Sequence, residues 1–110
     1  MFKITKSHAF THTVNVQTPI DGDQHREDSF QARFKMLPSD ALDAFDMSTD
    51  QGTKDFLRAA VLSTEDVMGE DDKPVAHSSE LLEQLIAAYN VRIAMVNTYF
   101  KAVTKARLGN

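Results

Sequence analysis

Two alternating stretches near the start of the chain predict a β-hairpin. Residues 11–20 are rich in β-branched side chains, with Val14 and Val16 separated by polar residues, as in a strand that buries one face. The next stretch places apolar side chains at every second position: Phe30, Ala32, Phe34 and Met36. Asp21-Gly22-Asp23 favours a turn between them, and because the polar run continues to Asp28 we expect a connection longer than a two-residue turn. Since an isolated hairpin is marginally stable in water, its apolar face should pack on the rest of the chain.

The apolar residues that follow recur at helical spacing. Ser39 is a candidate N-cap for a short helix that carries Leu42 and Phe45, and Thr49 is a candidate N-cap for the next helix. The apolar positions of that second helix are Phe56, Leu57, Ala60 and Val61. Residues 69–74 contain Gly, Pro and four consecutive charged residues and predict a loop. Short strands at 67–68 and 75–76 would make this loop a second, smaller hairpin.

The last third of the chain predicts two further helices. Ser78 or Ser79 is expected to cap the first of them, and Asn90 marks a break before the second. The expected buried positions of the first are Leu81, Leu82, Leu85, Ile86 and Tyr89, and those of the second are Ile93, Val96, Phe100 and Val103. Gly109 is a candidate C-cap.

Together these elements predict an α+β fold, in which an N-terminal β-hairpin packs on a small bundle of helices and the chain closes with a C-terminal helical pair. A length of 110 residues is typical of one domain. We therefore expect a single domain over residues 1–110, with residues 1–10 as a candidate flexible N-terminal arm.

Charge is distributed unevenly around the net value of -4. Residues 38–80 contain eleven acidic and three basic residues, whereas residues 81–110 contain one acidic and four basic residues. A nucleic-acid-binding protein usually carries a dense basic surface, so this balance argues against DNA or RNA as a partner. Faces of opposite sign favour protein partners or further copies of the same chain.

The residue types that would support catalysis or metal binding are sparse. The chain has no cysteine, which excludes disulfides, thiolate nucleophiles and cysteine-ligated metal sites. His8 and His12 would face one metal only on a helix, and their surroundings predict a strand. The acidic residues of segments 21–28 and 65–72 lie in polar stretches that would not raise a carboxyl pKa for acid–base work. We expect neither an enzyme nor a metal or cofactor site.

No apolar stretch approaches the roughly 20 residues of a membrane span, and no signal-peptide pattern precedes the polar residues 11–13. The expectation is a soluble, intracellular protein without a membrane partner. By themselves these properties describe a small acidic α+β binding domain.

The C-terminal aromatic and basic residues form the candidate partner-binding surface. Tyr99 is expected at the edge of the last apolar stripe, where an aromatic side chain would be partly exposed and could anchor a partner helix. Lys101 and Lys105 should stack on one face of this helix. The full candidate set is Tyr89, Tyr99, Phe100, Lys101, Lys105 and Arg107; the acidic residues 65–72 of a neighbouring copy would offer opposing charge.

Several short motifs follow one another along the chain. A Phe-x-Ala-x-Phe-Lys-x-Leu strand (residues 30–37) is followed by the acidic stretch Val-x-Gly-Glu-Asp-Asp-Lys-Pro-Val (residues 67–75). Ser-Ser-Glu-Leu-Leu (residues 78–82) comes next, and Tyr-Phe-Lys-Ala (residues 99–102) precedes a Gly-Asn ending. This order of motifs resembles that of the tail assembly chaperones of long-tailed bacteriophages, and the resemblance covers about residues 11–110. Relatives often carry a Trp before the acidic loop, where this chain has Leu62-Ser63-Thr64 and no Trp at all.

The resemblance implies a non-enzymatic role in virion morphogenesis. Proteins of this family are thought to bind the tape measure protein, to recruit subunits of the major tail tube protein onto it, and to leave before the virion is complete. It implies a phage or prophage protein of the host cytoplasm that forms at most a weak homo-oligomer. The alternatives are a ring-forming head–tail connector or tail terminator, and a small regulator whose acidic middle mimics DNA.

Overall fold

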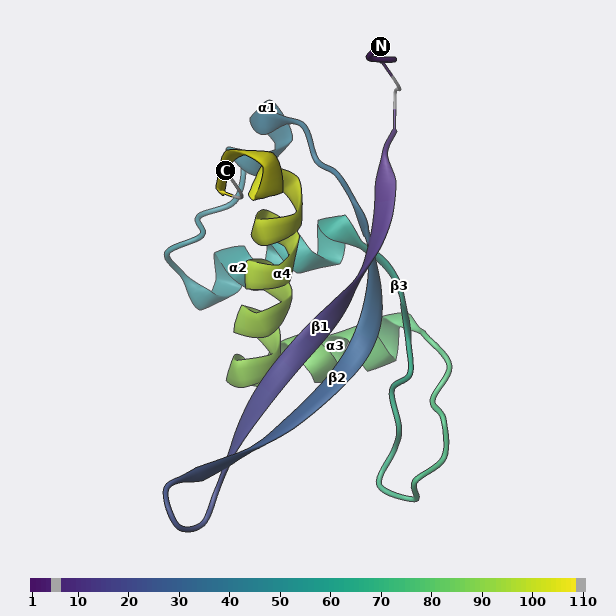
Figure 1. Ribbon diagram of the computed structural model, residues 1–110, viewed down its shortest axis with the longest axis vertical. Helices are drawn as coiled ribbons and strands as arrows, with labels where there is room; N and C mark the ends of the chain where they lie inside the picture. Colours follow the sequence, from purple (N-terminus) through teal and green to yellow (C-terminus); the bar gives the residue numbers. More distant parts are fainter. Residues whose placement is uncertain (5–6, 109–110) are drawn as a thin grey trace.

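A computed structural model describes residues 1–4 and 7–108 of the chain, and the side chains of its last helix as far as Thr104. Over these residues it confirms the expected α+β class, with a three-stranded antiparallel sheet and four helices (Figure 1). The elements are β1 (Ala9–Ile20), β2 (Gln24–Lys35), α1 (Ser39–Leu42), α2 (Asp50–Ala60), β3 (Val61–Glu65), α3 (Ser79–Ala87) and α4 (Tyr89–Leu108). The strand order is β1-β2-β3, and the first strand begins inside the segment expected as an arm.

The strands of the N-terminal hairpin are longer than the sequence suggested. β1 and β2 pair along their whole length, from Ala9 with Lys35 to Ile20 with Gln24. The connection is therefore residues 21–23, which is longer than a two-residue turn as expected, although the polar residues 24–28 belong to β2 and not to the connection. Gly22 (φ 80°) and Asp23 (φ 59°) take the left-handed conformation that closes it, which glycine and aspartate tolerate best. The polar residues 24–28 can form strand because they lie on a projecting tip that has little apolar surface to bury.

The third strand was not expected. Val61 continues the helical spacing of α2, but the backbone becomes extended there (φ -84°, ψ 122°) and β3 pairs with β2. The register shifts at the step between Arg33 and Phe34, and this irregularity leaves Leu62 46% exposed while Val61 and Thr64 stay buried. The strand breaks the helical pattern because Val61 completes the sheet beside Phe34.

Side-chain caps fix the start of the two middle helices as predicted. Thr49 Oγ1 accepts a hydrogen bond from the amide of Gly52 at 3.0 Å, and Ser78 Oγ accepts one from the amide of Leu81 at 3.0 Å. At α1 the prediction was one residue off, because Pro38 occupies the N-cap position and Ser39 is the first helical residue.

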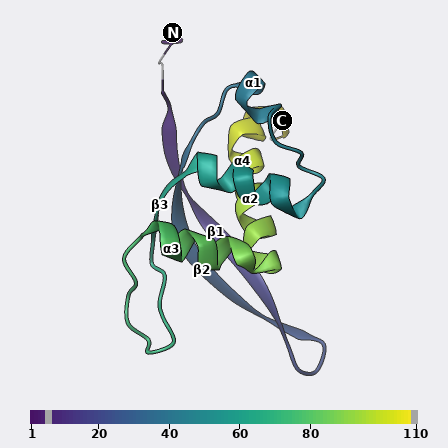
Figure 2. The same cartoon turned by 180° about the vertical axis from the view of Figure 1, so that it is seen from behind.

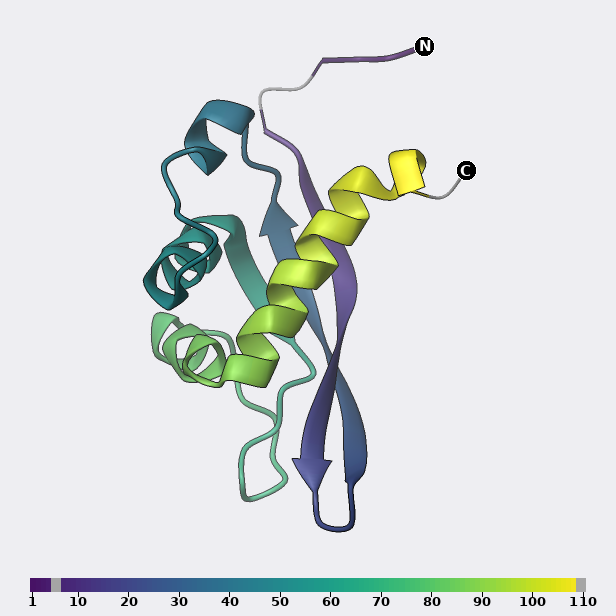
Figure 3. The ribbon, with the colours of Figure 1, turned by 90° about the vertical axis from the view of Figure 1, so that its left-hand side faces the viewer.

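All the longer helices lie on one face of the sheet. α4 runs obliquely along this face and contacts β1 (Figure 3), and α2 and α3 lie crosswise to α4 (Figure 2). The fully buried centre comes from every layer: Val14, Ala32, Phe34, Phe56, Leu57, Ala60 and Met95. Met36, expected in this core, is 46% exposed, because β2 ends at Lys35.

The opposite face of the sheet is polar. Gln31 Nε2 donates to Thr13 Oγ1 at 2.8 Å, and Arg33 donates to Thr11 Oγ1 at 3.2 Å. Cross-strand polar pairs of this kind suit a face in contact with water. Among the described residues, no helix combines the length and the apolar character that crossing a membrane requires.

Candidate protein-binding surfaces

Tyr99 belongs to the centre of the core, so the prediction that it is a partly exposed anchor is wrong. Its side chain is 1% exposed, and its hydroxyl accepts a hydrogen bond from the amide of Leu37 at 2.9 Å. Its ring meets those of Phe34 and Phe56 edge to face, with centroids 5.7 and 5.0 Å apart. Tyr99 thereby joins α4 to the sheet and to the segment after β2.

The buried face of α4 differs from the predicted stripe. As far as Thr104, the buried residues of α4 are Arg92, Met95 and Tyr99, at positions i, i+3 and i+7. The predicted stripe flanks this line and is half-buried: Ile93, Val96, Phe100 and Val103. Phe100 stacks on Phe56, with the ring centroids 5.5 Å apart. Since α4 carries apolar residues on several sides, the spacing alone did not identify the side that meets the sheet.

Tyr89 lies on the surface, as the candidate partner-binding set requires, and the apolar spacing that also placed it among the buried positions of α3 is wrong for this residue. The chain turns at Ala88 (φ -82°, ψ 121°), so Tyr89 is the first residue of α4 and is 66% exposed. The break thus comes before Asn90, whose amide instead donates to the Gln17 carbonyl at 3.1 Å and to Thr18 Oγ1 at 3.2 Å. The Arg92 guanidinium lies 5.3 Å from the centre of the Tyr89 ring, within the range of a cation–π contact.

Of the candidate set, Tyr89 and Lys101 are therefore exposed on α4, and Phe100 is half-buried. Tyr89, Ile93 and Phe100 follow one another at positions i, i+4 and i+11, which places them on one side of the helix, and Lys101 is exposed beside Phe100. We call Tyr89, Ile93 and Phe100 the outer stripe. The side chains of Lys105 and Arg107, the other two predicted cations, lie outside the described residues.

Arg92 is a buried cation that the sequence did not reveal. It is 3% exposed, donates to the carbonyl of Ile86 at 2.9 Å and forms an ion pair with Asp50 at 3.0 Å. These partners lie near the end of α3 and at the start of α2. Arg92 therefore connects the start of α4 with the end of α3 and the start of α2. These contacts indicate a structural role.

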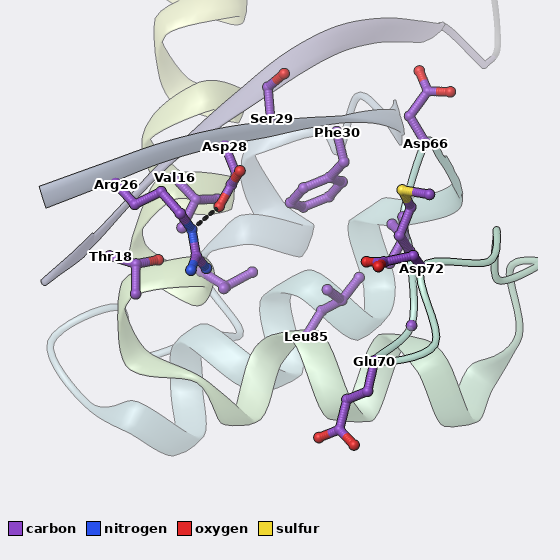
Figure 4. A pocket seen from close by; sticks show the side chains of 14 residues that line it. Val16, Thr18, Arg26, Asp28, Ser29, Phe30, Asp66, Glu70, Asp72 and Leu85 are labelled. Carbon is purple, nitrogen blue, oxygen red and sulfur yellow. Dashed lines mark hydrogen bonds and ion pairs between the residues drawn. The ribbon is translucent and has the colours of Figure 1, made fainter. Parts of the chain in front are cut away.

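A groove of about 720 Å³ opens beneath the projecting part of the hairpin (Figure 4). Its apolar lining comes from five parts of the chain: Val16, Phe30, Val67, Met68, Leu85 and Val91. Phe30 and Leu85 point into it from opposite sides in Figure 4. Because these residues are far apart in the sequence, no local pattern could have predicted the groove.

The charged residues of the groove are mostly acidic. Arg26 and Asp28 pair with each other at 2.7 Å, which leaves Asp66, Glu70 and Asp72 as a rim of carboxylates. In the part of the chain that the structure describes, none of these three carboxylates forms an ion pair. We call them the acidic rim.

The acidic rim belongs to a closed loop between β3 and α3. Val75 donates to the Val67 carbonyl at 2.8 Å, and Gly69 donates to the Lys73 carbonyl at 3.0 Å. A second hairpin was expected here. This loop instead contains an isolated antiparallel bridge between Met68 and Pro74. Asp66 and Asp72 adopt positive φ values of 65° and 60°, so this loop is a defined turn that presents its carboxylates beside the groove.

Shifted pKa values occur away from the groove and reflect local pairing. Hydrogen bonds from the Ser48 hydroxyl and amide lower the pKa of Asp46, and the hydrogen bond from Arg58 lowers the pKa of Glu83. Within residues 1–4 and 7–108, no group of three histidine or acidic side chains gathers as metal ligands would.

Comparison with known proteins gives no relative from which a role could be transferred. No protein-family model, curated protein or solved structure matches the chain.

Proposed function

We propose that this protein is a non-enzymatic phage tail assembly chaperone that binds the tape measure protein and recruits subunits of the major tail tube protein. It acts in the host cytoplasm during virion morphogenesis and leaves before the virion is complete. The proposal rests on the motif order described above together with a surface suited to a helical partner. The outer stripe of α4 is the observation that carries it.

The outer stripe has the chemistry of a helix-docking surface. Tyr89 is 66% exposed and lies outside the main apolar core, as does Ile93. An exposed aromatic residue in line with apolar neighbours at helical spacing can anchor an amphipathic helix. Lys101 adds a cation at the end of the stripe, and the half-buried Phe100 limits the apolar area. A contact of this size favours reversible binding, which an assembly factor that leaves its partner requires.

Capture by immobilised tape measure protein tests this surface. We expect the double substitution Tyr89→Ala and Ile93→Ser to weaken capture of the tape measure protein at least tenfold while the thermal midpoint stays within a few degrees of the parent. Leu62→Ser is the matched control, because Leu62 is a similarly exposed apolar residue on β3. Unchanged capture of both the tape measure protein and the tail tube protein by a folded double variant would contradict the proposal.

A ring-forming connector or tail terminator remains the second candidate, because the hairpin projects well beyond the helices (Figure 1). Projecting strands can pair between neighbouring subunits of a ring. Sedimentation velocity separates the two roles. A ring gives one species of fixed stoichiometry, whereas the chaperone gives a monomer or a concentration-dependent oligomer.

A further inference from the structure

The N-terminal residues form an exposed apolar segment without a place in the core. Phe2 is 89% exposed and Ile4 is 86% exposed, and Lys3 lies between them. In an extended chain, alternate side chains point to opposite sides, so Phe2 and Ile4 share one side and Lys3 points to the other. Apolar side chains this exposed commonly mark an interaction site.

The groove beneath the hairpin matches this segment in three respects. Its lining includes Met68, which is 59% exposed, so apolar surface is available there. The acidic rim offers carboxylates to a cation. Among the described residues β2 pairs with β3 only from Gln31 to Phe34, so its edge over residues 24–30 is available for an added strand.

Phe2 and Ile4 cannot both lie in the groove of their own molecule. Val16, which lines the groove, lies seven residues along β1 from Ala9, or roughly 23 Å at the rise of a strand. Ile4 is five residues before Ala9, so it can extend at most about 18 Å from it. Figure 1 places the N-terminal segment and the loop of the acidic rim at opposite ends of the molecule.

We propose that residues 1–4 of a second copy of this chain bind in the groove. Phe2 and Ile4 lie against the apolar lining around Met68 and Leu85, and Lys3 lies against the acidic rim. The backbone of the segment runs beside the free edge of β2. Each copy offers one segment and one groove, so the contact is head-to-tail and can join many copies in a row.

This contact uses no residue of the outer stripe and is independent of the proposed partner. A segment of four residues buries little surface, which predicts a weak, concentration-dependent association. The pairing of Lys3 with carboxylates predicts that salt weakens it.

Sedimentation velocity of the full chain over a range of concentrations tests the contact. The segment variant is Phe2→Ser with Ile4→Ser, and the groove variant is Met68→Lys. We expect the parent to associate as its concentration rises and each variant to remain monomeric. When the two variants are mixed, they should form 1:1 heterodimers, because one supplies an intact groove and the other an intact segment. Leu62→Ser should associate as the parent does.

Three results would overturn this proposal: a parent that is monomeric at every concentration, a segment variant that associates like the parent, or a mixture that forms no heterodimer. Measuring capture by the tape measure protein with the same variants distinguishes failure of this contact from failure of the proposed function. The segment variant should be captured normally as a monomer, and the outer-stripe double variant should still self-associate. If Met68→Lys instead loses capture and leaves self-association unchanged, the groove belongs to the other partner and the proposal fails.

Discussion

At the scale of single residues, Gly52 shows how closely the turn before α2 packs on the helix. Gly52 is buried in the first turn of α2, where its amide donates to the capping Thr49 hydroxyl. A Cβ atom at this position would overlap the backbone carbonyl of Asp46. The obstacle is backbone and not a flexible side chain, so the α1–α2 connection would have to move.

Replacement of Gly52 by Ala should therefore destabilise the protein. Replacing Gly by Ala inside a helix usually raises the free energy of unfolding by about 1 kcal/mol. Because of the overlap, we expect Gly52→Ala instead to lower the free energy of unfolding by about 2 kcal/mol or more. Urea unfolding of Gly52→Ala measures the effect, and Gln51→Ala, at the exposed neighbouring position, should cost little. Equal stability of Gly52→Ala and the parent would show that residues 46–49 can shift freely.

The two tyrosines explain why the partner surface was only partly predictable. Both tyrosines belong to the candidate partner-binding set, but the apolar spacing also places the exposed Tyr89 among buried positions, and it places the buried Tyr99 at a partly exposed edge. The environment of Tyr99 depends on a hydrogen bond to the amide of Leu37, 62 residues away. That of Tyr89 depends on a turn at Ala88, one residue from the expected break. Neither feature has a local sequence signature.

At the scale of elements, α2 and α3 are tied by a surface ion pair. The Arg58 guanidinium donates to both carboxylate oxygens of Glu83, at 2.8 and 2.7 Å. This hydrogen bonding lowers the pKa of Glu83 and raises that of Arg58. Both side chains are well exposed, so water and salt screen the pair.

The lowered pKa fixes the sign of the pH dependence. The stabilising contribution of Glu83 is fully present above the ordinary glutamate pKa of 4.5 and is lost as the pH falls through the lower folded value. We therefore expect Glu83→Gln to lower the thermal midpoint slightly at pH 7, and this difference from the parent to shrink as the pH falls below 4.5. Glu65→Gln, which removes an exposed carboxylate on β3, is the control. A difference that persists at low pH would mean that packing and not charge accounts for the effect.

The elements with local signals were predicted, and those fixed by tertiary pairing were not. Thr49 and Ser78 identify helix starts because a capping hydroxyl acts on amides two or three residues away. β3 was missed because Val61 fits both the apolar spacing of α2 and a strand beside Phe34. The groove was missed for the same kind of reason, because its lining comes from five separate parts of the chain.

At the scale of the whole molecule, hairpin and helices share one hydrophobic core. Phe34 is fully buried, and its ring lies 5.6 Å from that of Phe10 and 5.7 Å from that of Tyr99. These rings come from β2, β1 and α4. The sheet and the last helix therefore bury their apolar side chains against each other in one shared core.

Truncation of Phe34 to Ala should consequently weaken the whole domain together. We expect the free energy of unfolding to fall by about 3–5 kcal/mol. This is a large share of the ~5–15 kcal/mol that is typical of a domain. Urea titration should give coincident transitions from far-ultraviolet circular dichroism and from tyrosine fluorescence, because no part of the described fold retains a separate core. Met36→Ala is the matched control, since Met36 follows Phe34 at the same alternation but is 46% exposed, and it should cost less than about 1 kcal/mol. A Phe34→Ala variant as stable as the parent, or two separate transitions, would show that the hairpin does not contribute to a common core.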